Sequence, residues 1–430
     1  MASLKPLVYV CVLSQHTLPL YEACLTWQPQ HVVLVVSKAF QQSASRFERQ
    51  LRKTLPNTQL HRPDENTGTL YLKGDSLEND TQWVDQILRP YLAQPIFSEL
   101  PLWLNLNGGT KSMSLILTTT MRWEKLDYRA SSENRLTVSS INYSHYGQAG
   151  ALTTLPAESR RLPQVQPIDV ALLYNSTAKE VTPNPLRDNP QSLPLAKRIF
   201  QGIEDNELGL SNVLSVLDNV WSRQRNAEHY QNKKLTLPLS DFCGAANGDS
   251  SAEELSLTWL NRFSTLCPEF FLVIGNAVQL PGNTRRLSKG AAAFKKWISG
   301  DWLEQLARSW LEKAGIPAAN ISGNLAVEST AGQSATGHET DLLIQHGSHT
   351  FQIEIKADLP PGQTANKLVE QLEGVNKFGL VQKILLIGPL LHQRLIDSDA
   401  LRQVFQRCAS NRITLVRNQL ELAKAIKGNR

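Results

Sequence analysis

The stretch Thr340–Lys356, TDLLIQHGSHTFQIEIK, reads as two β-strands joined by a tight turn at Gly347-Ser348. A glycine-first pair suits a two-residue hairpin, and the turn of a hairpin fixes which residues face each other. In this register Asp341 faces Glu354. Because directly opposite side chains lie close together, these two carboxylates repel each other unless a cation neutralises them.

The residues around this acidic pair suit metal-assisted hydrolysis. Lys356 follows Glu354 by two positions, so the period of a strand places both on one face, while Ile353 and Ile355 point into a core. Mg²⁺ and Mn²⁺ prefer oxygen ligands such as carboxylates. We therefore expect a metal site made by Asp341, Glu354 and the Ile355 carbonyl, with Lys356 beside a metal-bound water that attacks a phosphodiester.

Two other interpretations use the same stretch. Many amphipathic edge strands carry Glu-x-Lys on a solvated face, and the tripeptide alone is weak evidence for a site. Three histidines near the hairpin suggest zinc, namely His338, His346 and His349. They stand at or beyond the turn rather than on the acidic face, which favours solvated turn histidines.

The composition is that of an ordinary soluble protein. The chain has 430 residues, of which 41% are apolar and 19% charged, and this length predicts two or three domains. No apolar run approaches a membrane span, and the N-terminus lacks the layout of a signal peptide. The five cysteines show no CxxC spacing, which indicates a reducing, cytoplasmic location. The net charge of +5 is compatible with a polyanionic partner without requiring one.

The first 150 residues alternate strand and helix signals. Leu7–Leu13 and His31–Ser37 are near-continuous apolar runs, as expected for strands buried on both faces. A third such run, Leu102–Leu106, leads directly into the sequence NGGTK and then into a helical stretch. Strand, glycine turn and helix in this order predict a Rossmann-like α/β sheet, which binds ligands beyond the carboxyl ends of its strands.

The NGGTK loop suits a phosphate or a nucleotide. Gly108 and Gly109 permit close approach of the backbone, and the helix start offers free N–H groups. Thr110 adds a hydroxyl and Lys111 a positive charge, after Asn107. The loop is neither a Walker loop nor GxGxxG, and by itself the pattern equally fits an ordinary capped turn.

The C-terminal part, residues 289–430, shows the element order α-β-β-β-α-β of a restriction-endonuclease-like core. On its first helix Leu303, Leu306, Ala307 and Trp310 form the buried stripe, and Glu304 lies on the margin of that stripe, from where it can lean over the sheet. Residues 151–288 contain a proline-rich stretch and ambiguous elements. They read as a linker with a small connecting subdomain.

These motifs together resemble a known family. The N-terminal sheet with NGGTK looks like a CARF domain, the Rossmann-like sensor of CRISPR-associated proteins, over residues 1–150. The segment with Asp341 and Glu354-x-Lys356 looks like a PD-(D/E)xK nuclease core, over residues 289–430. The combination is similar to the CARF–nuclease effectors of type III CRISPR systems, with the linker and connecting subdomain at 151–288.

The resemblance implies a function and its residues. In that family, homodimers bind a cyclic oligoadenylate, most often cyclic tetra-adenylate, and binding activates a metal-dependent endonuclease that cuts DNA, RNA or both. The matching ligand loop is Asn107–Lys111, with Ser14 and Gln15 as its companion loop. The matching catalytic residues are Asp341, Glu354 and Lys356, assisted by Glu304.

Two functions from other classes remain open. One is a ligand-responsive regulator that binds nucleic acid without cleaving it, which would make the acidic hairpin structural. The other is a ring nuclease, in which the NGGTK pocket degrades the cyclic oligoadenylate itself. Neither accounts for Asp341 facing Glu354. The ring size of the activator, the choice between DNA and RNA, and the gating geometry are not readable from the sequence.

Overall fold

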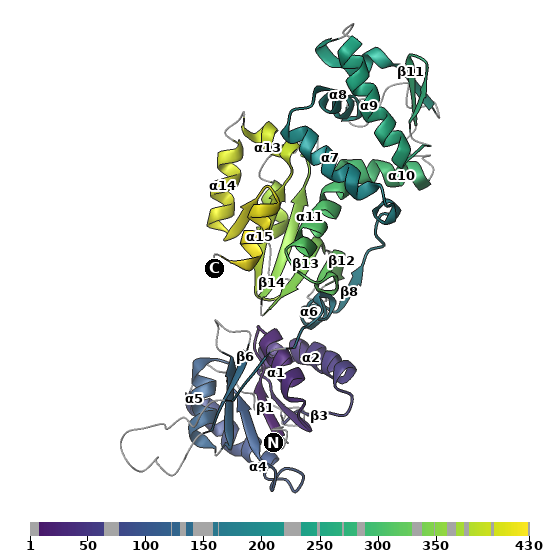
Figure 1. Cartoon of the computed structure of the whole chain (residues 1–430). Coiled ribbons are helices and arrows are strands. Elements are labelled where there is room, and N and C mark those ends of the chain that lie inside the picture. Colours follow the sequence, from purple (N-terminus) through teal and green to yellow (C-terminus); the bar gives the residue numbers. More distant parts are fainter. Residues whose placement is uncertain are drawn as a thin grey trace.

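A computed structural model describes residues 8–63, 77–121, 123–129, 135–140, 158–161, 163–218, 234–246, 250–268, 271–281, 289–328, 338–347, 349–358, 367–373, 378–396 and 400–428. Across these residues the strands form three sheets, of seven, three and six strands. The seven-stranded sheet lies at one end of the molecule, the six-stranded sheet in the middle and the three-stranded sheet at the other end (Figure 1). Among the described helices, none combines the length and the apolar character needed to cross a bilayer.

The first sheet has the strand order β3-β2-β1-β4-β5-β6-β7. Its first five strands run parallel: β1 (Val8–Val12), β2 (His31–Val35), β3 (Gln59–His61), β4 (Leu102–Asn105) and β5 (Lys125–Arg129). The strands β6 (Arg135–Ser140) and β7 (Glu158–Arg161) extend it antiparallel. The strand order reverses at β1, so the ends of β1 and β4 border the crevice in which such sheets bind ligands.

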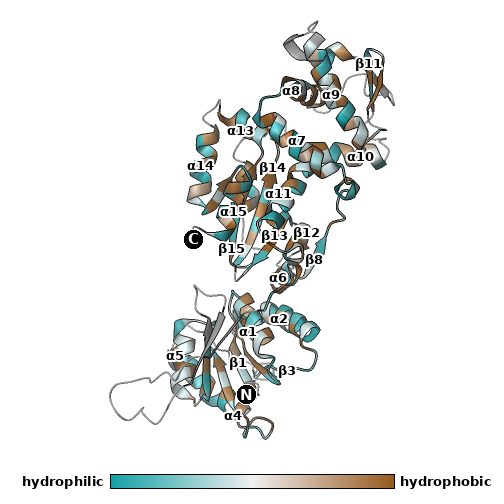
Figure 2. Ribbon diagram, viewed as in Figure 1, coloured by the Kyte–Doolittle hydropathy of each residue, from teal (hydrophilic) through white to brown (hydrophobic). Residues whose placement is uncertain are grey.

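Helices cover both faces of this sheet. The helices α1 (Leu18–Trp27) and α2 (Gln41–Thr54) pack on the face that carries Tyr9 and Cys11. On the opposite face lie α3 (Leu77–Trp83), a π-helical turn (Val84–Leu88), α4 (Arg89–Leu92) and α5 (Lys111–Thr120). Strand β1 is buried throughout, which is the physical reason for its continuous apolar sequence. Hydrophobic residues concentrate on the strands, and hydrophilic residues cover outer helices such as α2 (Figure 2).

The middle of the chain begins with α6 (Pro167–Tyr174), β8 (Thr177–Glu180), a 3₁₀ turn (Pro185–Asp188) and α7 (Ser192–Glu204). A small subdomain follows, made by α8 (Leu208–Asp218), β9 (Lys234–Pro238), a 3₁₀ stretch (Leu239–Ala246), α9 (Ser250–Leu266), β10 (Leu272–Ile274) and β11 (Ala277–Pro281). Its antiparallel sheet has the order β10-β11-β9. This three-stranded sheet lies within the range 151–288 that the sequence suggested as a connecting region.

The third sheet has the order β16-β15-β14-β13-β12-β8. Its strands are β12 (Ile321–Glu328), β13 (His338–His346), β14 (His349–Lys356), β15 (Val381–Ile387) and β16 (Ile413–Val416), with β8 at the edge. The helices around it are α10 (Lys289–Lys296), α11 (Trp302–Lys313), α12 (Lys367–Glu373), α13 (Pro389–Ile396), α14 (Ala400–Ser410) and α15 (Gln419–Lys427). From α11 to β15 the elements follow the predicted order α-β-β-β-α-β.

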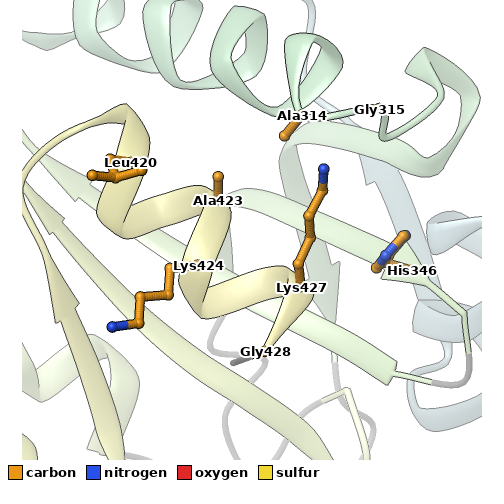
Figure 3. A pocket seen from close by; sticks show the side chains of 8 residues that line it. All are labelled: Ala314, Gly315, His346, Leu420, Ala423, Lys424, Lys427 and Gly428. Atoms are coloured by element: carbon orange, nitrogen blue, oxygen red, sulfur yellow. The ribbon is translucent and has the colours of Figure 1, made fainter. Parts of the chain in front are cut away.

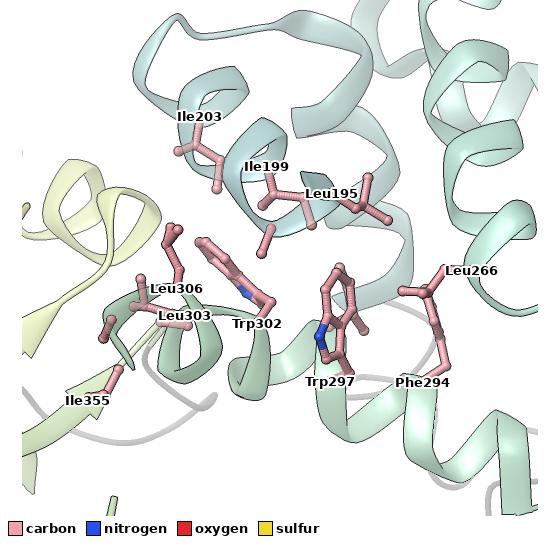
Figure 4. Packing of buried hydrophobic residues seen from close by; sticks show 14 of the residues in the cluster. Leu195, Ile199, Ile203, Leu266, Phe294, Trp297, Trp302, Leu303, Leu306 and Ile355 are labelled. Carbon is pink, nitrogen blue, oxygen red and sulfur yellow. The ribbon is translucent and has the colours of Figure 1, made fainter. Parts of the chain in front are cut away.

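One hydrophobic cluster joins α11, the third sheet and α7. Trp302 of α11 lies next to Ile199 of α7, and Leu303 and Leu306 lie on its other side, where Leu303 is near Ile355 of β14 (Figure 4). All five residues are buried. The segment that carries α7 is thus part of the same core as the acidic hairpin.

The sheets divide the chain differently from the expected boundaries at 150 and 288. Strand β7 (Glu158–Arg161) still belongs to the first sheet, and β8 (Thr177–Glu180) already belongs to the third. Both are four-residue strands rich in charged residues. Because β8 is a largely exposed edge strand, it carries no apolar alternation from which the sequence could have revealed it.

The helix that carries Glu304 begins further upstream than α11 itself. A π-helical turn (Trp297–Asp301) continues α10 directly into α11. A π turn keeps the helix continuous while shifting its apolar face, so a local glycine does not terminate it.

Candidate functional site

The hairpin of β13 and β14 has the register that the sequence predicted. Leu342 pairs with Ile353 and His346 with His349, and the same register places Asp341 opposite Glu354. Gly347 adopts a φ of 57°, which glycine tolerates best; Ser348 lies outside the described residues. The alternate residues of β14, which are Phe351, Ile353 and Ile355, lie in the hydrophobic core as expected.

The acidic pair is held by close polar contacts. The Asp341 Oδ2 atom accepts a hydrogen bond of 2.6 Å from the Ile355 N–H group. Lys356 Nζ lies 2.8 Å from Glu354 Oε1 and donates to it. Glu354 is only 1% exposed, and its second oxygen, Oε2, is buried without a hydrogen-bond partner. A buried carboxylate oxygen without a partner raises the free energy of the folded protein, so this atom is available as a ligand for a cation.

Burial disfavours the ionised form of both Asp341 and Glu354. Burial and the neighbouring Asp341 raise the pKa of Glu354 to about 8, while Lys356 opposes the rise. Burial also raises the pKa of Asp341, against the effect of Lys356 and the Ile355 N–H group. Burial lowers the pKa of Lys356, but the two acids outweigh burial and raise it overall. A divalent cation between the acids would favour their charged forms.

The donor set fits a hard divalent cation that keeps several waters. Among the described residues, no group of three or more His, Cys, Asp or Glu side chains is arranged to hold a metal ion. Magnesium sites commonly use only one or two carboxylates and complete the shell with water. Asp341, Glu354 and a backbone oxygen such as that of Ile355 satisfy this requirement, and the unpaired Glu354 Oε2 supplies the free ligand atom.

Glu304 reaches this site from α11. Burial and the nearby Asp341 raise the pKa of Glu304 to about 7, and Arg187 opposes the rise. The Glu304 carboxylate forms an ion pair with Arg187. Asn324 takes a φ of 51°, and its amide, oriented to satisfy both neighbours, donates to Glu304 at 3.2 Å and accepts from Arg187 at 3.1 Å. The predicted acid is therefore electrostatically linked to Asp341.

Arg187 and Asn324 were not among the predicted site residues. Arg187 comes from the 3₁₀ turn Pro185–Asp188, which the Asn184 side chain caps by accepting from the Leu186 N–H group at 3.0 Å. The Asn184 amide also donates to Asp301 at 2.9 Å. These contacts fix the turn on the helices beside the site. Arg187 precedes Asp341 by more than 150 residues within a proline-rich stretch, so no local pattern could reveal it.

The NGGTK loop lies where β1 and β4 end. A Cβ atom at Gly108 would collide with the carbonyl oxygen of Val12, and Gly109 has a φ of 78°, so both positions favour glycine. Thr110 caps α5 by accepting from the Met113 N–H group at 3.3 Å. Since β1 pairs with β4 in parallel, the Ser14–Gln15 segment and the loop meet at one edge. Gln15, Thr110 and Lys111 are exposed there, and Ser14, Asn107 and Gly109 are partly exposed.

A buried polar network lies beneath this loop. The Asn105 side chain accepts from the Asn107 N–H group at 2.9 Å and donates to Asp127 at 3.0 Å. Tyr9 and Trp27 also donate to Asp127, and burial raises the pKa of Asp127 to about 6 despite these hydrogen bonds. The network fixes the base of the loop. The single signal in the sequence was the position of Asn105 at the end of an apolar strand.

Two of the three histidines near the hairpin, His346 and His349, lie apart from the acidic pair. The pair of His346 and His349 lies five residues along the hairpin from the acids, which is roughly 16 Å at the rise of a strand. The side chain of His338 lies outside the described part of the structure. His346 lines a separate pocket of about 680 Å³ between the end of α11 and α15, where Lys424 and Lys427 lie (Figure 3). His346 and His349 therefore add no ligand to the acidic site.

Comparison with known proteins identifies the fold. No family model matches the chain, and no curated protein matches it in sequence. Among solved structures, Can2 from Sulfobacillus thermosulfidooxidans in complex with cyclic tetra-adenylate is similar, with a TM-score of 0.61 and 17% identity over 98% of this chain and 96% of Can2. Protein VC1899 from Vibrio cholerae gives a TM-score of 0.65 and 15% identity over 98% and 96% of the two chains.

These similarities extend over nearly the whole chain and establish its architecture. The predicted α/β fold, with a Rossmann-like N-terminal sheet followed by a second mixed sheet, is confirmed. The resemblance to CARF effectors is thereby supported at the level of the fold. At this level of identity the similarity concerns the fold, so ligand and activity depend on the residues described above.

Proposed function

We propose that this protein is a metal-dependent endonuclease that a cyclic oligoadenylate activates, acting in type III CRISPR defence. The observation that carries the proposal is the buried acidic pair of Asp341 and Glu354, with Lys356 at 2.8 Å from Glu354 and one Glu354 oxygen unpaired. A purely structural hairpin has no reason to bury two opposed carboxylates, because their mutual repulsion and desolvation both cost stability.

In this proposal each residue has a defined role. Asp341, Glu354 and the Ile355 carbonyl would hold Mg²⁺ or Mn²⁺, which supplies a water of lowered pKa and neutralises charge on the phosphate. Lys356 orients that water or donates to the developing negative charge. Glu304 holds Arg187 by an ion pair, and the guanidinium of Arg187 stabilises the phosphate, since its planar fork matches phosphate oxygens.

The activator binds at the edge formed by the ends of β1 and β4. The glycines bring backbone N–H groups close to a phosphate, and the start of α5 adds the positive end of its dipole. Ser14, Gln15, Thr110 and Lys111 supply side-chain contacts. We propose cyclic tetra-adenylate as the ligand, because the similar protein Can2 was solved in complex with it. Two copies of the chain share one ring across a two-fold axis.

The test incubates the protein with supercoiled plasmid and with single-stranded RNA in Mn²⁺. Parallel reactions contain cyclic oligoadenylates of each ring size, or none, and matched reactions contain EDTA. We expect cleavage that requires both the metal and one ring. Binding of nucleic acid without cleavage under every condition would support a regulator, and loss of the ring in a Glu354→Gln protein would support a ring nuclease.

A further inference from the structure

The helix α6 (Pro167–Tyr174) belongs to two hydrophobic cores at once. Val170 and Leu173 pack in the cluster of the first sheet and its helices α1 and α2. Ala171 packs in a different cluster with Leu325 of β12 and with Phe378, which precedes β15. All five side chains are buried. An eight-residue helix with this double packing cannot move in one core without disturbing the other.

Hydrogen bonds attach the end of α6 to both sides. Arg46 of α2 donates to the Leu173 carbonyl at 3.4 Å, and Arg49 of α2 donates to the Ser176 carbonyl at 3.0 Å. Guanidinium groups suit this position, because the carbonyls at a helix C-terminus are unpaired and carry partial negative charge. The Ser176 hydroxyl in turn donates to the Glu328 carbonyl of β12 at 2.8 Å.

Tyr174, the last residue of α6, reaches the start of α1. Its hydroxyl accepts the Leu18 N–H group at 3.2 Å. Leu18 is the first residue of α1, and the preceding residue, Thr17, makes no side-chain capping hydrogen bond. The tyrosine therefore satisfies an N-terminal N–H group that the helix leaves unpaired. Leu18 follows Ser14 by four residues, so this contact fixes the segment that leads to the proposed ligand site.

The ring of Tyr174 also contacts the segment before β15. Gly379 has a φ of 78°, and a Cβ atom at this position would collide with the tyrosine ring. Two residues later β15 begins and pairs in parallel with β14, where Leu385 is the partner of Glu354. One side chain thus lies between the start of α1 and the strand next to the acidic site.

We propose that Tyr174 is the positioning residue through which ligand binding at the Ser14–Gln15 segment reaches the acidic site. This inference rests on the proposed function and specifies its regulation. A displacement of the α1 start by the ligand either carries the Tyr174 hydroxyl along or breaks its hydrogen bond. Either change alters the position of the ring against Gly379. Because packed interfaces shift between discrete arrangements, this change alters the position of β15, whose Leu385 is the partner of Glu354.

The experiment compares Tyr174→Phe with Tyr21→Phe in the full-length protein. Each variant loses one tyrosine hydroxyl that makes a hydrogen bond near α1. The Tyr174 hydroxyl accepts from Leu18, and the Tyr21 hydroxyl donates to Thr54, between α1 and α2, at 3.2 Å. The measured quantity is the cleavage rate at saturating cyclic tetra-adenylate divided by the rate without it. We expect this ratio to fall roughly fivefold in Tyr174→Phe, as loss of one hydrogen bond implies, and to change less than twofold in Tyr21→Phe.

A second measurement is independent of cleavage. Amide hydrogen exchange of residues 378–387 should respond to the ligand in the wild type and respond less in Tyr174→Phe. Equal activation ratios and equal exchange responses in wild type and Tyr174→Phe would overturn the relay while leaving the proposed function intact. A wild-type protein that neither cuts nor changes its exchange with any ring would overturn the proposed function, and the relay with it.

Discussion

The edge of the first sheet and the hairpin of the third sheet differ in the groups that they offer: backbone and exposed polar side chains at the edge, buried acidic side chains at the hairpin. The proposed ligand edge, made by Ser14, Gln15 and Asn107–Lys111, consists of backbone brought close by Gly108 and Gly109, with exposed polar side chains such as Lys111 around it. The acidic site consists of buried side chains, and Glu354 is 1% exposed with a strongly raised pKa. Backbone N–H groups suit a ligand that is itself charged, such as a phosphate. Buried carboxylates raise the free energy of the folded protein through desolvation and mutual repulsion, and a bound cation lowers it again.

A substitution at the acidic site should therefore reduce cleavage, whereas one at the edge of the first sheet should reduce ligand binding. We expect the largest effect at the acidic site, where Glu354→Gln removes a charged ligand but keeps the shape. Cleavage should fall roughly a thousandfold, the scale of losing several kcal/mol of metal-assisted stabilisation. Binding of the cyclic oligoadenylate should stay within threefold of wild type. Rates in Mn²⁺ and calorimetric titration of the ring measure the two quantities.

The control for this prediction is Glu328→Gln. Glu328 is an exposed acid on β12 whose carboxylate accepts from Thr177 at 3.2 Å, so its change should leave cleavage within twofold of wild type. Undiminished cleavage by the Glu354→Gln protein would remove the acidic pair from the catalytic machinery.

The second prediction concerns the ligand edge. Lys111→Ala should weaken binding of the cyclic oligoadenylate about 10- to 100-fold, because a hydrogen bond to a charged phosphate contributes about 1.5–3 kcal/mol. Cleavage at saturating ligand should approach the wild-type rate, since the acidic site is untouched. Dose–response curves separate these two effects. Lys313→Ala, at an exposed lysine at the end of α11, is the control, and equal potency in both variants would contradict the sensor assignment.

The third prediction tests Arg187, which forms an ion pair with Glu304 beside the acidic site. Arg187→Ala should lower the cleavage rate about tenfold and Arg187→Lys less, because a lysine keeps the charge but loses the planar fork. The change should also weaken binding of a nucleic acid substrate measured in Ca²⁺. If Arg187→Ala lowered thermal stability alone, with the rate at 20 °C unchanged, the arginine would be a structural partner of Glu304.

The smallest expected effect is on stability as a function of pH. The folded-state pKa of Glu354 is about 8, above the usual value near 4.3 for an unfolded chain, so the folded protein binds this proton more tightly. The associated stability is complete below about pH 4 and is lost as the pH rises through 8. In EDTA the melting temperature should fall by a few degrees between pH 6 and 8.5, and less in Glu354→Gln.

Divalent cations should reverse this trend, because metal ligands must be deprotonated and the metal competes with the proton. The stabilisation by Mn²⁺ should therefore grow with pH in the wild type. A melting temperature with the same pH dependence in wild type and Glu354→Gln would show that this carboxylate is not the buried group responsible.

The sequence predicted most accurately those features that local backbone geometry determines. The register of the hairpin follows from the turn at Gly347, which is why Asp341 was expected opposite Glu354 and Lys356 beside it. The apolar strands of the first sheet were readable because helices cover both faces, and the glycines after β4 were readable because a close backbone approach excludes side chains. Each of these features leaves a mark in the local sequence, even where the contact behind it is distant, as between Gly108 and Val12.

Features that depend on distant contacts were not readable. The edge strand β8 has a polar sequence, since one side of it faces solvent, and the predicted boundaries at 150 and 288 consequently differ from the sheets. The sequence placed Glu304 on a helix margin, but it gave no sign of the partner Arg187. No periodicity marks an arginine that enters a site from a proline-rich turn.

By itself, the sequence determined the α/β class, the two candidate sites and the pairing within the hairpin, because turn chemistry and the alternation of strands act over short distances. Only the tertiary structure decided that Arg187 and Asn324 join Glu304 and that the ring of Tyr174 lies between α1 and Gly379. Such contacts arise when separate apolar surfaces are buried together, and burial brings together residues that no local pattern connects.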